Sequence, residues 1–325
     1  METTQIEQRG VSTPENDVRN ANSNQGLFPK AFCKIVPDAL GDFKNFLFSK
    51  PTVNVMNSNG VGSRTAQAHL HWKETGDINV WKNVAQNAVV LNLDDLICSG
   101  VTNNILLSST INYNSAEIPK EVVNTVVSGI EDYLENLRSQ KINIHFGNIK
   151  ITDVGDLVQS ITIDTTAAAR IRQGEIIAND RIQANDVIIG LASCEQDIFL
   201  PFQTYLPVMK AILENFRPSI HGLVHCGEQT QCLKFVDNLH IVKDNLFAVP
   251  SGFSNIHNAS NTFWQDAYQK FNMGHRFEIF TKEKIADDII KIARHFNIGA
   301  QIVGYCEAAQ NKGLTIKSKH GEFRY

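Results

Sequence analysis

The stretch of sequence that decides the fold is VNVMNSNGVGSR, Val53 to Arg64. Its β-branched residues predict a strand, Gly60 and Gly62 predict a tight turn, and Ser63 and Arg64 open a predicted helix. Glycines let backbone N–H groups turn inward, a helix N-terminus carries partial positive charge, and an arginine can reach phosphate oxygens. The pattern is typical of a phosphate cradle. It also occurs in ordinary tight connections, so other segments must decide between the two.

The composition is that of a globular protein. At 325 residues, with 42% hydrophobic and 20% charged residues, the chain is long enough for two well-packed domains. The net charge of −4 and the scattered lysines and arginines argue against nucleic-acid binding. The polar first 25 residues lack the apolar core of a signal peptide, and no later apolar run reaches the length of a membrane span. We therefore expect a cytoplasmic protein with no membrane or nucleic-acid partner.

Strand-length apolar runs alternate with segments of helical period, which predicts a mixed α/β fold. Residues 26–40 are expected to be helical, and residues 119–140 form the clearest helix, with a proline at the start and an apolar stripe along one face. Residues 160–171 are expected to form a long strand. The order of strands and helices repeats in both halves. This repeat predicts a polar arm at 1–25 and domains at 26–159 and 160–325, with the boundary near Gln159.

Cysteines offer a second kind of site. The chain contains no Cys-x-x-Cys pair, and most cysteines lie in apolar surroundings, which favours buried thiols. A zinc site built from His225, Cys226 and Cys232 is the alternative, although this spacing is not typical of a tetrahedral site.

Six segments together resemble one known family: MNSNGVGSR, LDDLICSGVTNNILLSST, TDVGDLV, NDVIIGLAS, HGLVHC and FNMGHR. They occur in the order and at roughly the separations of the aminoimidazole ribonucleotide (AIR) synthetases, the phosphoribosylformylglycinamidine cyclo-ligases of purine synthesis. The resemblance covers nearly the whole chain. It implies an N-terminal α/β domain that pairs with its twin in a homodimer, a C-terminal α/β domain, and ATP in the cleft between them. It also implies chemistry in which phosphoryl transfer activates an amide oxygen before a ring nitrogen attacks.

The resemblance also implies roles for individual residues. It places Asp95 on the family's metal–nucleotide carboxylate, and it gives catalytic roles to Asp95, Asn272 and His275. The residues implied to bind the nucleotide are Asn59, Gly60, Gly62, Ser63, Arg64, Asp94, Asp95 and Lys150. The alternative for the aspartates is that they cap or solvate a helix end, and the alternative for His275 is a packing or capping role.

Four departures from the family pattern bear on this site. Asn59 stands where the family has an aspartate, so a metal-binding carboxylate is replaced by an amide. Lys150 stands where the family has a glutamate, and an ammonium would oppose a nearby Mg²⁺. Several dozen residues of the family pattern are missing near residues 194–203, and Glu228 follows Gly227 where further glycines are expected. These changes put Mg²⁺ in doubt.

Three functions remain open. The first is ATP-dependent ring closure of formylglycinamidine ribonucleotide to AIR, with ATP, magnesium and a purine-pathway ribonucleotide as ligands. The second is a non-catalytic relative that keeps the fold and the dimer and serves as a partner or regulator. A different ATP-using enzyme of the same superfamily ranks last, because no distinguishing motif supports it.

Overall fold

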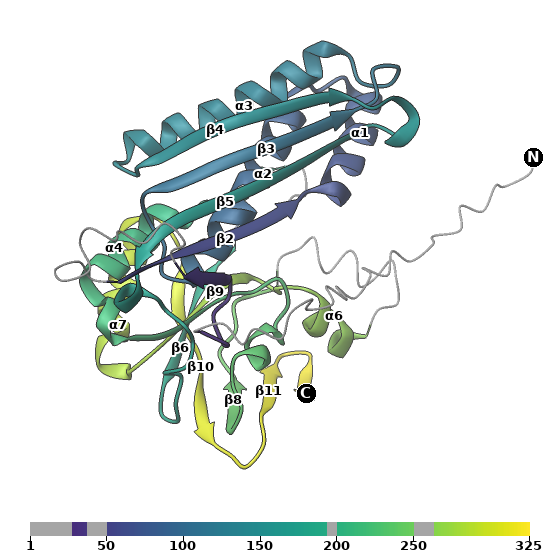
Figure 1. Ribbon diagram of the computed structural model, residues 1–325. Helices are drawn as coiled ribbons and strands as arrows, with labels where there is room; N and C mark the ends of the chain where they lie inside the picture. The colour runs from purple at the N-terminus through teal and green to yellow at the C-terminus, as the bar shows by residue number, and fades with distance from the viewer. Residues whose placement is uncertain (1–27, 38–50, 194–199, 250–262) are drawn as a thin grey trace, which may run out of the picture.

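The structure is a computed structural model, and it describes residues 28–37, 51–193, 200–249 and 263–325. Two sheets organise the chain (Figure 1). The described helices and strands alternate along both halves, which confirms the predicted α/β class. No helix among the described residues is long and apolar enough to cross a bilayer.

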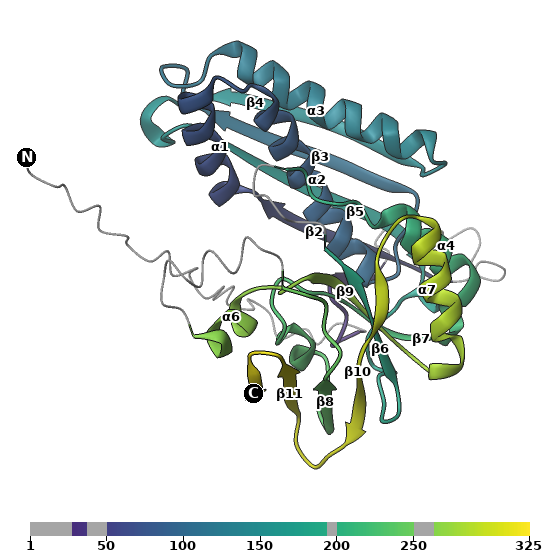
Figure 2. The same cartoon turned by 180° about the vertical axis from the view of Figure 1, so that it is seen from behind.

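The first sheet has five strands in the order β1-β2-β5-β3-β4. Its strands are β1 (Lys34–Pro37), β2 (Thr52–Gly60), β3 (Ile105–Tyr113), β4 (Ile144–Asp153) and β5 (Ile161–Arg172). The β3–β4 pair is parallel and the other pairs are antiparallel. Three helices cover one face: α1 (Gly62–Thr75), α2 (Asn79–Cys98) and α3 (Lys120–Ser139). Figure 1 looks onto the opposite face, which none of the described helices covers, and Figure 2 shows the helices in front.

The second sheet has seven strands in the order β12-β11-β8-β10-β6-β9-β7. Its strands are β6 (Val187–Ala192), β7 (Ile220–His225), β8 (Leu239–Lys243), β9 (His275–Thr281), β10 (Ala300–Ala308), β11 (Gly313–Ser318) and β12 (Gly321–Arg324). The associated helices are α4 (Leu206–Phe216), α6 (Trp264–Lys270) and α7 (Ala286–His295). The sequence analysis did not identify β8, β9, β11, β12 or α6.

Residues 119–140 fold as predicted. Helix α3 begins directly after Pro119, and its buried residues repeat at the spacing of one helical face. At Gly129 this face comes so close to α2 that an added Cβ would lie 2.9 Å from the Lys82 Cα atom. The two helices therefore pack backbone to backbone at this point.

The prediction of a helix over residues 26–40 was wrong for the part that the structure describes. Residues 34–37 form β1, which pairs antiparallel with β2 so that Lys34 lies opposite Met56. Ile35 and Val36 are β-branched and suit an extended backbone, and Pro37 at the end of an edge strand removes no ladder hydrogen bond from the sheet interior. Residues 38–40 lie outside the described part.

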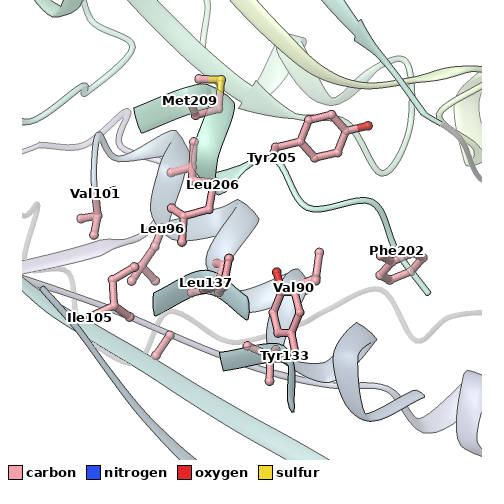
Figure 3. Packing of buried hydrophobic residues seen from close by; sticks show 14 of the residues in the cluster. Val90, Leu96, Val101, Ile105, Tyr133, Leu137, Phe202, Tyr205, Leu206 and Met209 are labelled. Atoms are coloured by element: carbon pink, nitrogen blue, oxygen red, sulfur yellow. The ribbon is translucent and has the colours of Figure 1, made fainter. Parts of the chain in front are cut away.

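Strand β5 follows the predicted boundary near Gln159 but pairs with β2 and β3 in the first sheet. The two sheets therefore divide between Arg172 and Val187. One apolar core nevertheless runs across this division. Figure 3 shows Tyr205, Leu206 and Met209, at the start of α4, lying over Val90 and Leu137 of the first layer.

Candidate functional site

The glycine turn has the predicted layout of strand, turn and helix. Strand β2 ends at Gly60, Val61 is buried, and α1 begins at Gly62. A Cβ atom at Gly60 would meet the Asp164 carboxylate at 2.2 Å, so only glycine fits beside this side chain in its present position. Gly62 and Ser63 are exposed, and an added Cβ at Gly62 would meet nothing within 4 Å. The turn therefore faces open space at the beginning of α1.

Asp95 lies on α2, behind this turn, and is only 7% exposed. Its Oδ2 accepts hydrogen bonds from the side-chain amides of Asn57 and Asn59, both at 2.8 Å. Its Oδ1 lies 2.8 Å from Nδ1 of His225, which comes from β7 of the second sheet. Alternation along β2 brings Asn57 and Asn59 to the same face, toward α2. Both oxygens of the carboxylate thus have hydrogen-bond partners.

A second ion pair continues this network. Arg276 on β9 lies 3.0 Å from Asp94, and both side chains are almost fully buried. The Arg276 Nε donates to Nε2 of His225 at 3.2 Å. A neutral His225 protonated on Nδ1 satisfies both contacts, because it donates to Asp95 and accepts from Arg276. The two adjacent aspartates of α2 are therefore connected to β7 and β9 through one histidine and one arginine.

Aromatic rings fill the space around His225. The His225 ring stacks on Phe277 with a centroid distance of 5.5 Å, and Phe32 lies 6.2 Å away. Phe32 in turn stacks on Phe235 at 5.4 Å, and Phe277 contacts Tyr205 at 4.8 Å. These five rings form a continuous column through the contact between the two sheets. We call it the aromatic column.

Arg64 and Arg276 both lie against Phe202. The guanidinium carbon of each is 3.9 Å from the centre of the Phe202 ring. Phe202 therefore contacts one arginine from α1 and one from β9. Phe202 is 7% exposed and lies in the segment that leads into α4. This segment coincides with the predicted deletion near residues 194–203, of which residues 194–199 lie outside the described part.

The residues at Asp95 do not fit Mg²⁺. This ion requires about six oxygen ligands at roughly 2.0–2.1 Å in octahedral geometry. Two amide N–H groups are directed at Asp95 Oδ2, and an imidazole nitrogen lies against Oδ1. Asn57 and Asn59 thus place donors where a cation would need oxygen ligands. The Asp95 carboxylate is thus held by hydrogen bonds, and the one arginine of the network forms its ion pair with Asp94.

Lys150 does not join the other predicted residues. It lies on β4, and the register places Thr110, Asp164 and Gly60 in the same cross-strand row. Three strand spacings of roughly 4.8 Å separate the β4 and β2 backbones. Lys150 shares the uncovered face with Asp164, whereas Asn59 lies on the helix-covered face. The expectation that the Lys150 ammonium opposes a cation at Asn59 therefore does not hold within one chain.

Asn272 and His275 also lie away from Asp95. The Asn272 side chain accepts a hydrogen bond from the Gly274 backbone at 3.1 Å and so shapes its own turn. His275 is fully buried and lies 2.9 Å from Glu278, which forms an ion pair with Lys243. Burial lowers the pKa of His275, which keeps it neutral. This environment fits the packing role that the sequence left open for His275.

The residues of the alternative zinc site lie in two different environments. His225 and Cys226 are consecutive on the chain and point to opposite sides, His225 toward Asp95 and Cys226 into the second core. Among the described residues, Cys226, His275 and Glu278 are the group close enough to share a metal ion. The Lys243 ammonium already contacts this Glu278. Cys33, Cys98, Cys226, Cys232 and Cys306 are free and buried, as predicted, and Cys194 lies outside the described part.

Sequence reasoning missed four residues of the network: Asn57, Phe202, His225 and Arg276. Asn57 could have been found, because it is two residues from Asn59 on a predicted strand and must share its face. His225 and Arg276 lie in recognised segments but gave no signal of their partners Asp95 and Asp94, which are more than 100 residues away along the chain. Phe202 lies where the family pattern stops, so no motif marked it.

Comparisons with known proteins agree with this architecture. Residues 52–171 match the family model for the AIR synthase related protein, N-terminal domain. The chain is 23% identical over 285 residues to a phosphoribosylformylglycinamidine cyclo-ligase of Methanocaldococcus jannaschii, covering 77% of each chain. It is 21% identical over 307 residues to the enzyme of the same name from Methanobrevibacter smithii, covering 82% of this chain and 83% of that protein.

Solved structures show the same fold. A HypE–HypF complex contains a chain with a TM-score of 0.63 and 12% identity, with coverage of 93% of this chain and 95% of that one. PurL of T. maritima complexed with ADP has a TM-score of 0.58 and 13% identity over 83% of this chain. The present chain spans only 42% of the length of that PurL.

Proposed function

We propose that this chain, which is similar to the AIR synthetase family in sequence and in fold, is a non-catalytic member that keeps the fold as a dimeric binding protein of purine nucleotide metabolism. The observation that carries the proposal is the state of Asp95. Its two oxygens are held by Asn57, Asn59 and His225 rather than available to a metal. We place the protein in the cytoplasm.

The arrangement around His225 supports the same proposal. The aromatic column and the Arg276–Asp94 ion pair lie between the two sheets, in the region where the family resemblance implies ATP. An enzyme that activates an amide oxygen needs a metal to neutralise the charge that develops on the transferred phosphoryl group. His225 and Arg276 hold Asp94 and Asp95 in a network that leaves them no such role.

The competing function is ring closure of formylglycinamidine ribonucleotide with ATP and Mg²⁺, which the names of the relatives favour. Turnover decides between the two. We expect ADP release at background when purified protein receives Mg-ATP and the formylglycinamidine nucleotide, and calorimetry to detect no Mg-dependent ATP binding. ADP release above background that depends on this nucleotide would refute the non-catalytic function.

The uncovered face of the first sheet supports a homodimer. Met56, Ala168 and Leu106 lie in one cross-strand row, and Met56 and Leu106 are each 54% exposed. Asp164 and Arg170 lie on the same face of β5, three residues before and three residues after Ala167. If two copies meet with antiparallel β5 strands, each Asp164 faces the Arg170 of the other copy. The same face would then bury the apolar row.

Light scattering of the wild-type chain tests this arrangement. We expect a mass of two chains, and we expect Leu106→Lys to give a mass of one chain, because it places like charges at the centre of the proposed interface. Leu157→Lys is the matched control, since Leu157 is 87% exposed and lies outside the sheet. A monomeric wild type would refute the homodimer but would not affect the turnover test.

A further inference from the structure

Strand β4 is an open edge of the first sheet. Among the described strands, β1 and β4 border the first sheet and β7 and β12 the second, with lengths of four, ten, six and four residues. Within the described part of the chain, β4 pairs with β3 alone. Figures 1 and 2 show β4 on the side of the first sheet that lies away from the second. A strand at the edge of a sheet has N–H and C=O groups with which a further strand can pair.

The two ends of this edge differ. The Ile144 carbonyl accepts a hydrogen bond from Arg138 Nε at 3.0 Å, so a side chain of α3 already covers the start of β4. The pairing with β3 then skips Gly147, which forms a bulge. Residues 148–153 pair with β3 without interruption. The part of the edge that can receive a strand therefore lies in the second half of β4.

A groove lies beside this edge, between α3 and β4, and has a volume of about 670 Å³. Val127 of α3 and Phe146 and Ile149 of β4 form its apolar floor, and all three are partly buried against the first core. Ile151 follows Ile149 by two residues and shares its face of β4, and it is 46% exposed. An added strand would place every second side chain over this floor. The groove therefore fits an occupant with alternate apolar residues.

The rim of the groove is acidic. Glu131, Asp132 and Glu135 line it from α3, and all three are exposed. Asp132 lies 2.9 Å from Lys82, and Glu135 lies 3.2 Å from Arg138. Glu131 forms no ion pair with any residue that the structure describes. Three carboxylates thus face two cations, and the groove keeps a negative charge that favours a basic occupant.

A second copy of this chain does not meet that requirement. If two β4 strands paired antiparallel about a two-fold axis perpendicular to the sheet, both α3 helices would lie on the same face, one on either side of the seam. The acidic residues of both helices would then line one groove, and like charges repel. Nucleic acids and anionic lipid surfaces are disfavoured for the same reason.

We propose that the β4 edge is a docking site for an extended, basic segment of another protein. The segment adds a sixth strand to the first sheet, its apolar side chains pack on the floor of the groove, and its lysines or arginines reach Glu131 and the neighbouring acids of α3. The groove lies on the helix-covered face, so it stays open when the uncovered face forms the homodimer. The proposal depends neither on that homodimer nor on the absence of catalysis.

The test uses the full chain and a fluorescein-labelled peptide, TVTRTVTRT, whose valines and arginines share one face of a strand. Fluorescence anisotropy measures its affinity, and amide hydrogen exchange locates it. We expect residues 148–153 to exchange more slowly when the peptide is bound. Glutamate in place of both arginines should weaken binding. N-methylation of two consecutive central residues should abolish binding, because each edge of the peptide then loses one N–H group.

Glu131→Lys tests the charge of the rim. Reversal of one exposed charge should weaken binding of the arginine peptide by about 2- to 30-fold and strengthen binding of the glutamate peptide. Glu283→Lys is the matched control, because Glu283 is also exposed and begins a short 3-10 helix (Glu283–Ile285) after β9 in the second layer. It changes the net charge equally and should leave both affinities at the wild-type level.

Equal affinity of wild type and Glu131→Lys for the arginine peptide would overturn the proposal. So would the absence of binding at millimolar peptide, slowed exchange outside β4, or full affinity of the N-methylated peptide. A wild-type mass of four chains, with residues 148–153 already protected without peptide, would assign the edge to a second copy instead. None of these measurements involves ADP release, so failure of the docking site is distinct from failure of the non-catalytic function.

Discussion

Asn59→Asp is the substitution that tests most directly how Asp95 is stabilised. In the wild type, the Asn59 amide donates to Asp95 Oδ2 at 2.8 Å. A carboxylate at position 59 removes this donor and adds a like charge beside Asp95. A hydrogen bond to a charged group contributes about 1.5–3 kcal/mol. Two carboxylates about 4 Å apart repel by about 1 kcal/mol in water and about 4 kcal/mol at an effective dielectric of 20.

Because Asn59 is exposed, the repulsion lies toward the lower of these values. We therefore expect Asn59→Asp to lower the free energy of unfolding by roughly 2–4 kcal/mol at neutral pH. The substitution also creates the carboxylate pair that a divalent cation can bridge. Millimolar Mg²⁺ should then recover most of the lost stability in the variant and leave the wild type unchanged.

Thermal unfolding with and without Mg²⁺ provides the measurement. Asn59→Leu is the control, because it removes the hydrogen bond without adding charge and should show no response to Mg²⁺. A wild type that gains as much stability from Mg²⁺ as Asn59→Asp would refute the reasoning, since Asp95 would then be available to a metal despite its amide partners. If Asn59→Asp in chelator had the same thermal unfolding midpoint as the wild type, the Asn59 amide would contribute nothing to stability.

Three other substitutions or conditions give measurable effects. Lys243→Met leaves Glu278 buried without its cation and should cost about 3–5 kcal/mol in urea unfolding, whereas the double change Lys243→Met with Glu278→Met should recover most of that loss. Gly129→Ala should lower the free energy of unfolding by roughly 1–3 kcal/mol, seen as a lower thermal midpoint, because its Cβ would lie 2.9 Å from the Lys82 Cα. Gly62→Ala is the control and should leave the midpoint unchanged, because its Cβ would meet nothing within 4 Å. Burial lowers the pKa of His275 below 6.5, so the unfolded chain binds a proton that the folded chain does not, and stability should fall as pH drops below about 6.5. His275→Gln should flatten this part of the pH profile. Burial alone would raise the pKa of Glu278, but Lys243 and His275 lower it to about 2, so a further loss of stability is expected between about pH 4.5 and 2.

The sequence was sufficient to predict those elements whose apolar residues recur at the spacing of a helix or a strand. The strand, glycine turn and helix from Val53 onward and the amphipathic helix α3 follow from spacing alone, because one face of each must be buried. Strand β1 failed for the opposite reason. Its four residues are too few to show a period, and pairing with β2 decides their conformation. Strand β9 is buried at every position, so it has no alternation to detect.

The candidate site was predictable to a similar extent. The asparagine at position 59, where the family has an aspartate, marked the point at which the sequence departs from the family's chemistry. The structure shows what the motif alone could not, namely that the Asn59 amide donates a hydrogen bond to Asp95. Lys150 aligned with the same motif set, but alternation and strand order place it on the far face of the sheet. The contacts of Arg276 and His225 depend on how the two sheets meet, which no local pattern encodes.

Phe32 has a consequence for how the chain folds during synthesis. It lies beside β1 at the start of the first sheet, yet its ring packs on Phe235 and His225, about 200 residues later in the sequence. At a synthesis rate of roughly 5–20 residues per second, the ribosome needs about 10–40 s to make the partners of this ring. The Phe32 ring therefore leaves the ribosome well before the two rings that it packs against. Nascent chains of this protein should keep this ring exposed until Phe235, which follows β7, has been made.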